Sequence, residues 1–352
     1  MTKTATYTCM VVGTGPAGLA AALSLAKVGA EVALVGPPTP VAAATDTRTA
    51  ALFNGSITLL ENLGVWRELE PVSAALKGIR IIDDTGGLLR APEVLFEARE
   101  VGERLFGWNV PNAPLAMALW EAAKRDKRIT IVETARVEHV EIRPDVAVAR
   151  TAEGEELRAK LVAAADGRRS ICRAAAGIAT TTWDYDQAAI ATRFEHSRPH
   201  DGISTEFHRK SGPFTVVPLP GLESGLVWVE RPAIAKRLVE LDEDGFRVVL
   251  ETRLQGLLGR VGAIGERRLF PLMGLTAEAY GRSRVVLIGE AGHVIPPIGA
   301  QGLNLGLRDA ATVADCVAEA MARGEDVGGP EVTRHYHERR KVDVESRIMA
   351  VD

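Results

Sequence analysis

A glycine-rich turn near the N-terminus limits the fold of this chain more than any other feature. It has the pattern GxGxxG and consists of Gly13, Gly15 and Gly18. An apolar, β-branched run over residues 8–12 precedes the turn, and a helix-forming stretch over residues 19–28 follows it and ends before Gly29. A second apolar run covers residues 31–35. This order predicts a strand, a tight turn, a helix and a second, parallel strand.

The chemistry of this turn favours a dinucleotide-type ligand. The first glycine permits the sharp turn, the second lets the backbone approach a pyrophosphate, and the third lets helix and strand pack closely. The helix N-terminus adds free N–H groups and a partial positive charge. A glycine-rich turn without a ligand is the alternative. The acidic ribose-binding residue usual at the end of the second strand is missing, because Gly36 occupies that place. We expect backbone, water or another side chain to supply this contact.

Composition places the chain among ordinary globular proteins. It has 352 residues, of which 46% are hydrophobic and 25% are charged, which predicts two domains or one domain with an insertion. A net charge of −4 argues against nucleic-acid binding through bulk charge. The three cysteines form no CxxC pair, so we expect reduced thiols in a cytoplasmic protein. We expect neither a signal peptide nor a transmembrane helix, and peripheral membrane contact stays open.

Nucleotide-type α/β patterns at both ends of the sequence enclose a stretch that is rich in strands. Strand-like runs over residues 214–219 and 225–229 accompany one helical stretch near residues 246–258. We therefore predict an α/β fold with a discontinuous, Rossmann-like nucleotide-binding domain and an inserted, mainly antiparallel β-sheet domain. The first domain comprises residues 1–75, 106–178 and 271–352, and the second comprises residues 76–105 and 179–270.

Two short motifs place charged residues near expected strand ends. Arg48, in the segment DTR at residues 46–48, is suited to neutralise a phosphate or to cover the edge of a planar cofactor. The alternative is a surface arginine paired with Asp46. Asp166 opens the segment DGRRS at residues 166–170 and could take hydrogen bonds at a cofactor cleft. The alternative for Asp166 is an ordinary Asp-Gly turn.

The most specific segment covers residues 289–304, with the sequence GEAGHVIPPIGAQGLN, and leads into a long helix over residues 303–323. Its two prolines stiffen the loop, and Gly299 and Gly302 let the backbone approach a planar ligand. The positive end of the helix would stabilise negative charge on a reduced flavin ring, and Glu290 could bind ribityl hydroxyls. The apolar residues that fall near one face of the helix are Leu303, Leu307, Ala311, Ala314, Ala318 and Met321.

Together these motifs resemble those of the flavoprotein aromatic hydroxylases of the para-hydroxybenzoate hydroxylase type, and in particular the branch that serves ubiquinone biosynthesis. The resemblance covers nearly the whole chain and is carried by residues 13–18, 46–48, 51–52, 63–66, 166–173, 270–272 and 286–309. It implies noncovalent FAD as cofactor, NAD(P)H as transient reductant and dioxygen as oxidant. It also implies hydroxylation of a phenolic ring through a flavin hydroperoxide, with a polyprenyl-phenol of ubiquinone biosynthesis as the favoured substrate.

Several alternatives to this function stay open. A different aromatic substrate is the nearest, and a non-catalytic flavin-binding member of a quinone-biosynthesis complex is another. An NAD-dependent dehydrogenase that uses only the N-terminal unit would leave the distal motif unexplained. A homodimer or a quinone-biosynthesis complex is compatible with the sequence, whereas a nucleic-acid partner is not expected.

The resemblance also implies roles for particular residues. The residues expected to bind FAD are Gly13, Gly15, Gly18, Arg48, Asn112, Asp166, Glu290, Pro297, Gly299, Gly302, Leu303 and Asn304. Pro297, Gly299 and Asn304 are expected in the catalytic machinery, and no metal ligand is implied. We expect the substrate pocket between the inserted sheet and the flavin, near residues 216–218 and Pro297. The catalytic base is left unassigned.

The sequence departs from the family pattern at three places: Gly36, Glu290 in place of the usual Asp, and an end of the sequence soon after Arg347. Two further features look functional but favour structural interpretations. The histidines at positions 196, 200 and 208 suggest a metal set, yet they lack ligand spacing and are interpreted as loop residues. Glycines recur at positions 256, 259, 262 and 265 without a preceding strand, which indicates a flexible connection. His293 is expected to form a structural hydrogen bond.

Overall fold

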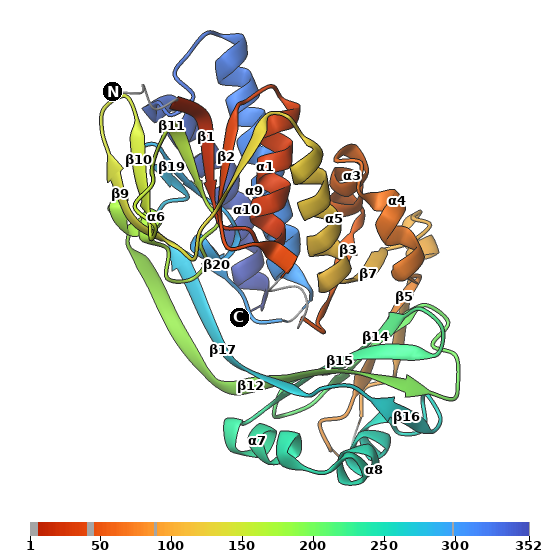
Figure 1. Ribbon diagram of the computed structural model, residues 1–352. Helices are drawn as coiled ribbons and strands as arrows, with labels where there is room; N and C mark the ends of the chain where they lie inside the picture. The colour runs from red at the N-terminus through yellow and green to blue at the C-terminus, as the bar shows by residue number, and fades with distance from the viewer. Residues whose placement is uncertain (1–5, 41–45, 88–89, 298, 352) are drawn as a thin grey trace.

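The computed structural model describes residues 6–40, 46–87, 90–297 and 299–351. Two large β-sheets lie one above the other in Figure 1, and a small three-stranded sheet lies between them at one side. The predicted α/β class, with a parallel core and a separate, mainly antiparallel sheet, is confirmed. No helix in these described ranges is long and apolar enough to cross a bilayer.

The first large sheet joins both ends of the chain. Its main path has the order β18-β19-β11-β1-β2-β8, and β1 pairs in parallel with both β2 and β11. The parallel strands are β1 (Thr6–Val12), β2 (Val32–Gly36), β8 (Ile129–Glu133), β11 (Glu156–Ala164) and β19 (Val285–Leu287). The strands β9 (Val137–Ile142), β10 (Ala147–Thr151) and β18 (Gly281–Arg282) add antiparallel pairs. Because β19 pairs with β11, the distal motif starts at the same sheet edge as the glycine turn.

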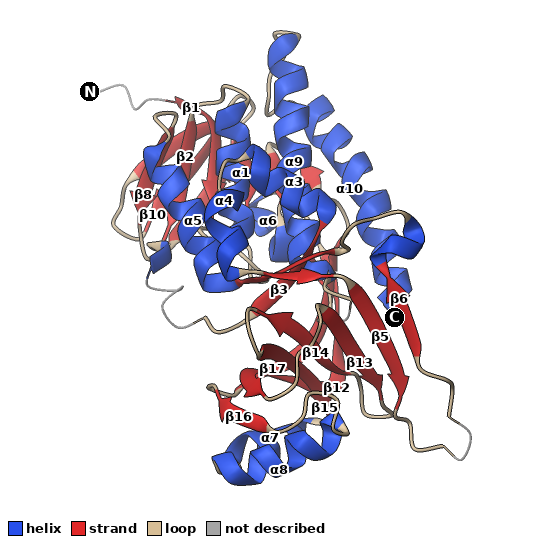
Figure 2. Ribbon diagram, turned by 90° about the vertical axis from the view of Figure 1, so that its right-hand side faces the viewer, coloured by secondary structure: helices blue, strands red, loops and turns tan. Residues whose placement is uncertain are grey.

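Helices cover this sheet and bring the two motif-bearing segments into contact. In Figure 2, α1, α5 and α9 stand side by side in front of the strands. The helices of this part are α1 (Pro16–Lys27), α3 (Asn54–Asn62), α4 (Trp66–Leu69), α5 (Asn112–Arg125), α6 (Ile171–Ala175), α9 (Gln301–Ala322) and α10 (Pro330–Val351). Short 3₁₀ turns cover Glu70–Val72, Ala98–Val101 and Gly289–Ala291.

The apolar face predicted for α9 is correct only in part. Leu307 and Ala314 are buried, whereas Met321 is 39% exposed. The buried residues also include Gly306, Ala310, Val313 and Val317. Gly306 marks the contact with α1, because a Cβ atom there would lie 3.0 Å from the Ala17 side chain. The buried side of the helix is therefore wider than predicted and has a glycine at its close approach to α1.

The second large sheet has the order β20-β17-β12-β15-β14-β13-β5-β6, with β16 paired to β12. Its strands are β5 (Gly78–Asp83), β6 (Val94–Glu97), β12 (Thr180–His196), β13 (Ile203–His208), β14 (Phe214–Leu219), β15 (Glu223–Glu230), β16 (Val261–Ile264), β17 (Arg268–Ala277) and β20 (His293–Val294). The long strands β12 and β17 run side by side from the first part to the second (Figure 1). Strand β17 continues past residue 271, where the predicted second domain ends and the first domain resumes. The predicted domain bounds stay a prediction.

The two faces of the second sheet differ. One face packs against helices α7 (Pro232–Glu240) and α8 (Glu243–Leu254), which lie below the sheet in Figure 2, around a core that includes Ile190, Phe214 and Trp228. The sequence pattern predicts a single helix near residues 246–258, but the chain forms two helices here. Pro232 opens the first, and the Asp242 carboxylate accepts from Gly245 N at 2.8 Å and caps the second.

A small sheet connects the two parts. It consists of β3 (Thr49–Phe53), β7 (Gly107–Pro111) and β4 (Ala74–Leu76). The buried Asn109 side chain on β7 donates to Pro218 O on β14 at 2.8 Å. A Cβ atom on Gly225 would lie 3.2 Å from Thr49 Oγ1, so the second face of the large sheet is turned towards β3. Because side chains alternate along strands, Val217 and Val227 share that face.

Candidate cofactor and active site

The three glycines of the N-terminal turn have different surroundings. A Cβ atom would lie 2.1 Å from Ala165 O at Gly13 and 2.1 Å from Gly13 O at Gly18. At Gly15, no atom lies within 4 Å of the corresponding position. The outer glycines are therefore required for packing between turn, helix and strand, and the middle glycine faces open space.

Helix α1 begins at this open space without a side-chain cap. Gly15 is the N-cap residue, Pro16 occupies the first turn, and no side chain accepts a hydrogen bond from the backbone there. Free N–H groups at the start of a 12-residue helix form a site suited to phosphate.

Gly36, at the end of β2, has a packing reason. A Cβ atom on Gly36 would lie 3.1 Å from the Thr14 side chain, whose hydroxyl donates to Pro37 O at 2.5 Å. Thr14 thus occupies the space beside the strand end. A larger residue at position 36 would displace it, which accounts for the missing acidic residue.

Arg48 forms the pair with Asp46 that the sequence analysis gave as one alternative. Its Nε and Nη2 atoms lie 2.9 and 2.8 Å from the two carboxylate oxygens, and its guanidinium lies 5.4 Å from the centre of the Phe270 ring on β17. Although partial burial would raise the pKa of Asp46, the hydrogen bonds from Arg48 hold it below its usual value. Asn112 Nδ2 also donates to Asp46, at 3.3 Å. Arg48 and Asn112, predicted separately, therefore meet at one carboxylate.

The Asp166 carboxylate lies at the start of α6, and only one of its two oxygens accepts hydrogen bonds. One carboxylate oxygen accepts from Ile171 N at 2.9 Å and from Cys172 N at 3.3 Å. The other oxygen is buried and has no hydrogen-bond partner in the described part of the chain, and the same holds for the side-chain oxygen of Asn112. Two of the predicted cofactor residues thus keep a free acceptor.

Glu290, just beyond β19, forms an ion pair with Arg168, in the segment that follows β11. Arg168 Nε lies 2.9 Å from Glu290 Oε2, and Nη2 lies 3.3 Å from Oε1. This ion pair connects two of the predicted motifs, which lie at the carboxyl ends of neighbouring parallel strands. In open α/β sheets, ligands bind at such strand ends.

The loop before α9 presents a second uncapped helix start. Ala300, the N-cap residue, has a left-handed backbone with φ of 55°, and no side chain caps the helix. Pro297 and Gly299 are exposed, and no atom lies within 4 Å of the Cβ position of Gly302. Leu303 is half-buried beside the main core. The N–H groups of this 22-residue helix are therefore accessible to a ligand lying against the loop.

The two uncapped helix starts are neighbours. The side chain of Ala17, the second residue of α1, lies against Gly306 of α9 and also against Gly289, with Cβ positions 3.0 and 3.5 Å away. The glycine turn and the distal loop, almost 300 residues apart in sequence, therefore lie side by side.

Asn304 holds the distal loop to β3. Its side-chain oxygen accepts from Phe53 N at 3.0 Å and from Ser56 Oγ at 2.7 Å. Its nitrogen donates to Ala51 O at 2.8 Å and to Ala300 O at 2.7 Å. The side chain is 3% exposed, and all four hydrogen-bonding positions of its amide are filled.

A buried charged network behind the loop was missed by the sequence analysis. Asp309 Oδ2 accepts from Gly289 N at 2.8 Å and lies 2.7 Å from His293 Nε2, and Arg340 Nε donates to Oδ1 at 2.5 Å. Burial alone would raise the pKa of Asp309, but His293 and Arg340 hold it below its usual value. The signal was the position of Asp309, four residues after Leu305 and four before Val313, which places a carboxylate on an apolar face of the long helix. The expected structural hydrogen bond of His293 is confirmed.

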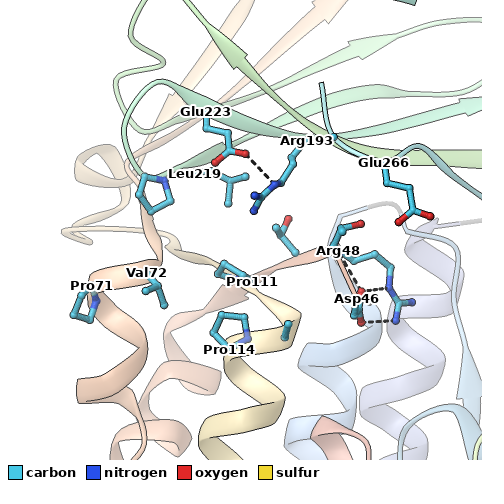
Figure 3. Close-up of a pocket in the computed structure, with 15 residues that line it drawn as sticks. Asp46, Arg48, Pro71, Val72, Pro111, Pro114, Arg193, Leu219, Glu223 and Glu266 are labelled. Atoms are coloured by element: carbon cyan, nitrogen blue, oxygen red, sulfur yellow. Dashed lines mark hydrogen bonds and ion pairs between the residues drawn. The ribbon is translucent and has the colours of Figure 1, made fainter. Parts of the chain in front are cut away.

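A pocket of about 590 Å³ opens between β3, the start of α5 and the second sheet (Figure 3). The charged residues around it are Asp46, Arg48, Arg193, Glu223 and Glu266. Leu219 and Pro220 line it, whereas the expected Val216 packs on the other face of the sheet, under α7 and α8. The prediction for Val216 is wrong because the alternation along β14 turns its side chain away.

The three histidines at 196, 200 and 208 form no metal site. No group of three or more metal-ligating side chains occurs among the described residues. His196 Nδ1 and Nε2 contact Arg198 O and Ser224 Oγ at 2.8 and 3.0 Å, and His208 pairs with Glu206 at 2.7 Å. The glycines from 256 to 265 lie between α8 and β16 and at the end of β16, not before a helix.

The parallel sheet, the glycine turn and the paired uncapped helices define the class of FAD-binding flavoproteins. Comparison with known proteins agrees, since a family model described as the FAD binding domain matches residues 6–350. The chain belongs to this family, its cofactor is FAD, and it is a flavoprotein monooxygenase.

Its relatives include the ubiquinone hydroxylase UbiL of Rhodospirillum rubrum, with 34% identity over 337 residues that cover 95% of this chain and 77% of the relative. The 3-demethoxyubiquinol 3-hydroxylase of Escherichia coli is 30% identical and is matched over 95% of this chain and 85% of its own. The solved structure of PqsL, a probable FAD-dependent monooxygenase of Pseudomonas aeruginosa, superposes with a TM-score of 0.81 at 19% identity, covering 99% and 95% of the two chains, which supports the fold.

Proposed function

We propose that this chain hydroxylates a prenylated phenol in ubiquinone biosynthesis, with NAD(P)H and dioxygen as co-substrates. The observation that carries the proposal is the juxtaposition of the uncapped starts of α1 and α9, where Ala17 contacts Gly306. The names of the relatives in Rhodospirillum rubrum and Escherichia coli support ubiquinone precursors as the substrate class.

The residues around these two helix starts fit FAD. The open space at Gly15 and the free N–H groups of α1 suit the pyrophosphate, and the unpaired acceptor of Asp166 suits a hydroxyl donor. We propose that Glu290 faces the ribityl chain and that Arg48 and Asn112 border the cofactor near Asp46. When bound, FAD supplies the redox chemistry that links NAD(P)H to dioxygen.

The distal loop would hold the flavin ring. We propose that Pro297, Gly299, Gly302 and Leu303 line the ring, and that the positive end of α9 stabilises the negative charge of its reduced form. Asn304 was predicted as a catalytic residue. Because its amide is already filled by four hydrogen bonds to the chain, we propose that it is a positioning residue that fixes the loop against β3.

The face of the second sheet that is turned towards β3 suits an aromatic ring. It carries small or branched apolar side chains, including Ala189, Val227 and Leu272. A ring held between this face and the distal loop would be shielded from water, which suits an oxygen transfer that competes with wasteful oxidation.

We also propose that the protein acts in the cytoplasm, in peripheral contact with the membrane that holds prenylated precursors. Co-sedimentation of the protein with lipid vesicles tests this membrane contact.

The test of the function is isotope incorporation. The FAD-loaded protein is incubated with NAD(P)H, a prenylated phenol and ¹⁸O₂, and the product is measured by mass spectrometry. The proposal predicts one labelled oxygen atom in the product, and none when the label is in water. NAD(P)H oxidation without labelling of any phenol tested would contradict the proposal and would favour a non-hydroxylating flavoprotein.

A further inference from the structure

Part of the wall of the pocket in Figure 3 is apolar, and the apolar residues differ in exposure. Leu219 is 2% exposed, Pro111 and Pro114 are half-buried, and Pro71 and Val72 are exposed at the outer end. Val72 is 40% exposed, and prolines make much of the wall rigid. Such a path suits an elongated apolar group that starts inside the protein and ends in solvent or in a lipid surface.

One side of this pocket touches the strand that anchors the distal loop. Arg48 and Thr49 line the pocket, and Thr49 begins β3. Two residues further along, Ala51 O accepts from Asn304, at the start of α9. The same strand therefore borders the pocket and holds the loop proposed to line the flavin.

The charges around the pocket do not suit an anionic ligand. Arg48 is paired with Asp46 at 2.8 Å, and Arg193 is paired with Glu223 at 3.1 Å. Glu266 is paired with Arg268 at 2.9 Å. Each of the five charged side chains that line the pocket thus has an ionic partner, and neither arginine is left to bind a phosphate or carboxylate.

We propose that this pocket binds the prenyl tail of the substrate and leads it out of the protein, past Leu219 and Pro111 to Val72. The inference rests on the proposed function, because it names the part of the substrate that the path accepts. The neutral chain needs no ionic partner and gains from burial against apolar walls.

The test compares Val72→Asp with Val248→Asp in the FAD-loaded protein. Val248 is 64% exposed on α8, so the control introduces the same charge at an exposed valine outside the pocket. The substrates are one phenol without a tail and the same phenol with one or three isoprene units. KM and kcat are measured by product formation, and equilibrium binding is measured by flavin fluorescence without NAD(P)H.

In the wild type we expect KM to fall by about tenfold or more with tail length, because each buried methylene favours binding. Val72→Asp should abolish this dependence and leave FAD content and the KM for NAD(P)H unchanged, and Pro220→Asp should act in the same direction. Val248→Asp should behave like the wild type.

A tail-length dependence that survives both pocket variants would overturn the inference, as would a change confined to the KM for NAD(P)H, which would assign the pocket to the reductant. These failures differ from failure of the proposed function. If no phenol is hydroxylated, the proposed function is refuted. The fluorescence titration still shows whether binding affinity depends on tail length and whether the pocket variants remove that dependence.

Discussion

Arg168 and Glu290 form a two-point ion pair across 122 residues of sequence, with Nε 2.9 Å from Oε2 and Nη2 3.3 Å from Oε1. Arg168 follows β11, and Glu290 follows the neighbouring strand β19. The pair therefore joins two predicted motifs beside the proposed cofactor site. It also neutralises a carboxylate beside the place proposed for an anionic cofactor.

Arg168→Gln should weaken FAD binding, because Glu290 would then repel the pyrophosphate. Both side chains are about half exposed, so we expect a change of only about two- to fivefold in Kd, smaller at high salt. Arg169→Gln is the matched control, since Arg169 is exposed and no ion pair is recorded for it within the described ranges. Titration of the stripped protein with FAD measures both. Equal loss of FAD affinity in the two variants would contradict a specific role of the Arg168–Glu290 pair and would assign the effect to net charge alone.

The same substitution at two glycines should have opposite consequences. Gly18→Ala places a Cβ atom 2.1 Å from Gly13 O and should destabilise the fold by about 1–3 kcal/mol or more. Gly15→Ala meets no atom within 4 Å and should keep the melting temperature of the apoprotein, while FAD affinity falls by about tenfold. Thermal unfolding and FAD titration separate the effects. A Gly15→Ala protein that binds FAD normally would contradict the pyrophosphate site.

Asp309→Asn should destabilise the protein by about 3–5 kcal/mol, because it leaves buried Arg340 without its main partner. Asp315→Asn, on the exposed side of the same helix, should change stability little. Chemical denaturation measures the free energy of unfolding.

The pH dependence of the same pair has a definite sign. The pKa of Asp309 is lowered in the folded protein, so its stabilising contribution is present above the unfolded value of about 3.9 and is lost as pH falls through the lower folded value. The free energy of unfolding of Asp309→Asn should lack this acid-sensitive contribution. If both proteins lose stability in parallel below about pH 4, other carboxylates control acid unfolding.

The three cysteines should be inert in the native protein. Burial raises the pKa of Cys9 to about 12 and that of Cys316 to about 11, and it also raises the pKa of Cys172. At pH 8 these thiols are protonated and shielded, so a thiol reagent such as DTNB should react only after denaturation, with all three residues. Rapid labelling of the native protein would contradict the described core.

The local turn and strand patterns were sufficient to predict the architecture of the first sheet. The strands predicted at residues 8–12 and 31–35 correspond to β1 (Thr6–Val12) and β2 (Val32–Gly36), and the glycine turn precedes α1 as expected. These features depend on contacts close in sequence, such as the Cβ clash that requires Gly18. The proposed cofactor residues follow from the same short motifs, and their roles stay predictions.

Features set by long-range packing could not be predicted from periodicity. The buried face of α9 is chosen by the close approach of Ala17 to Gly306, which no pattern within the helix reveals. Asp309 is buried because Arg340, on the last helix, reaches it. Val216 and Val217 look alike in sequence, and only the pairing of β14 with β15 decides which one faces β3.

Both ends of the chain are proposed to form one FAD site. Calorimetric titration of the stripped protein with FAD tests this, with the wild type compared with Gly15→Val and Gly302→Val. We expect one FAD bound per wild-type chain and weaker binding in both variants, because each side chain would enter open space at an uncapped helix start. Saturable binding that neither variant changes, or no binding by the wild type, would contradict it.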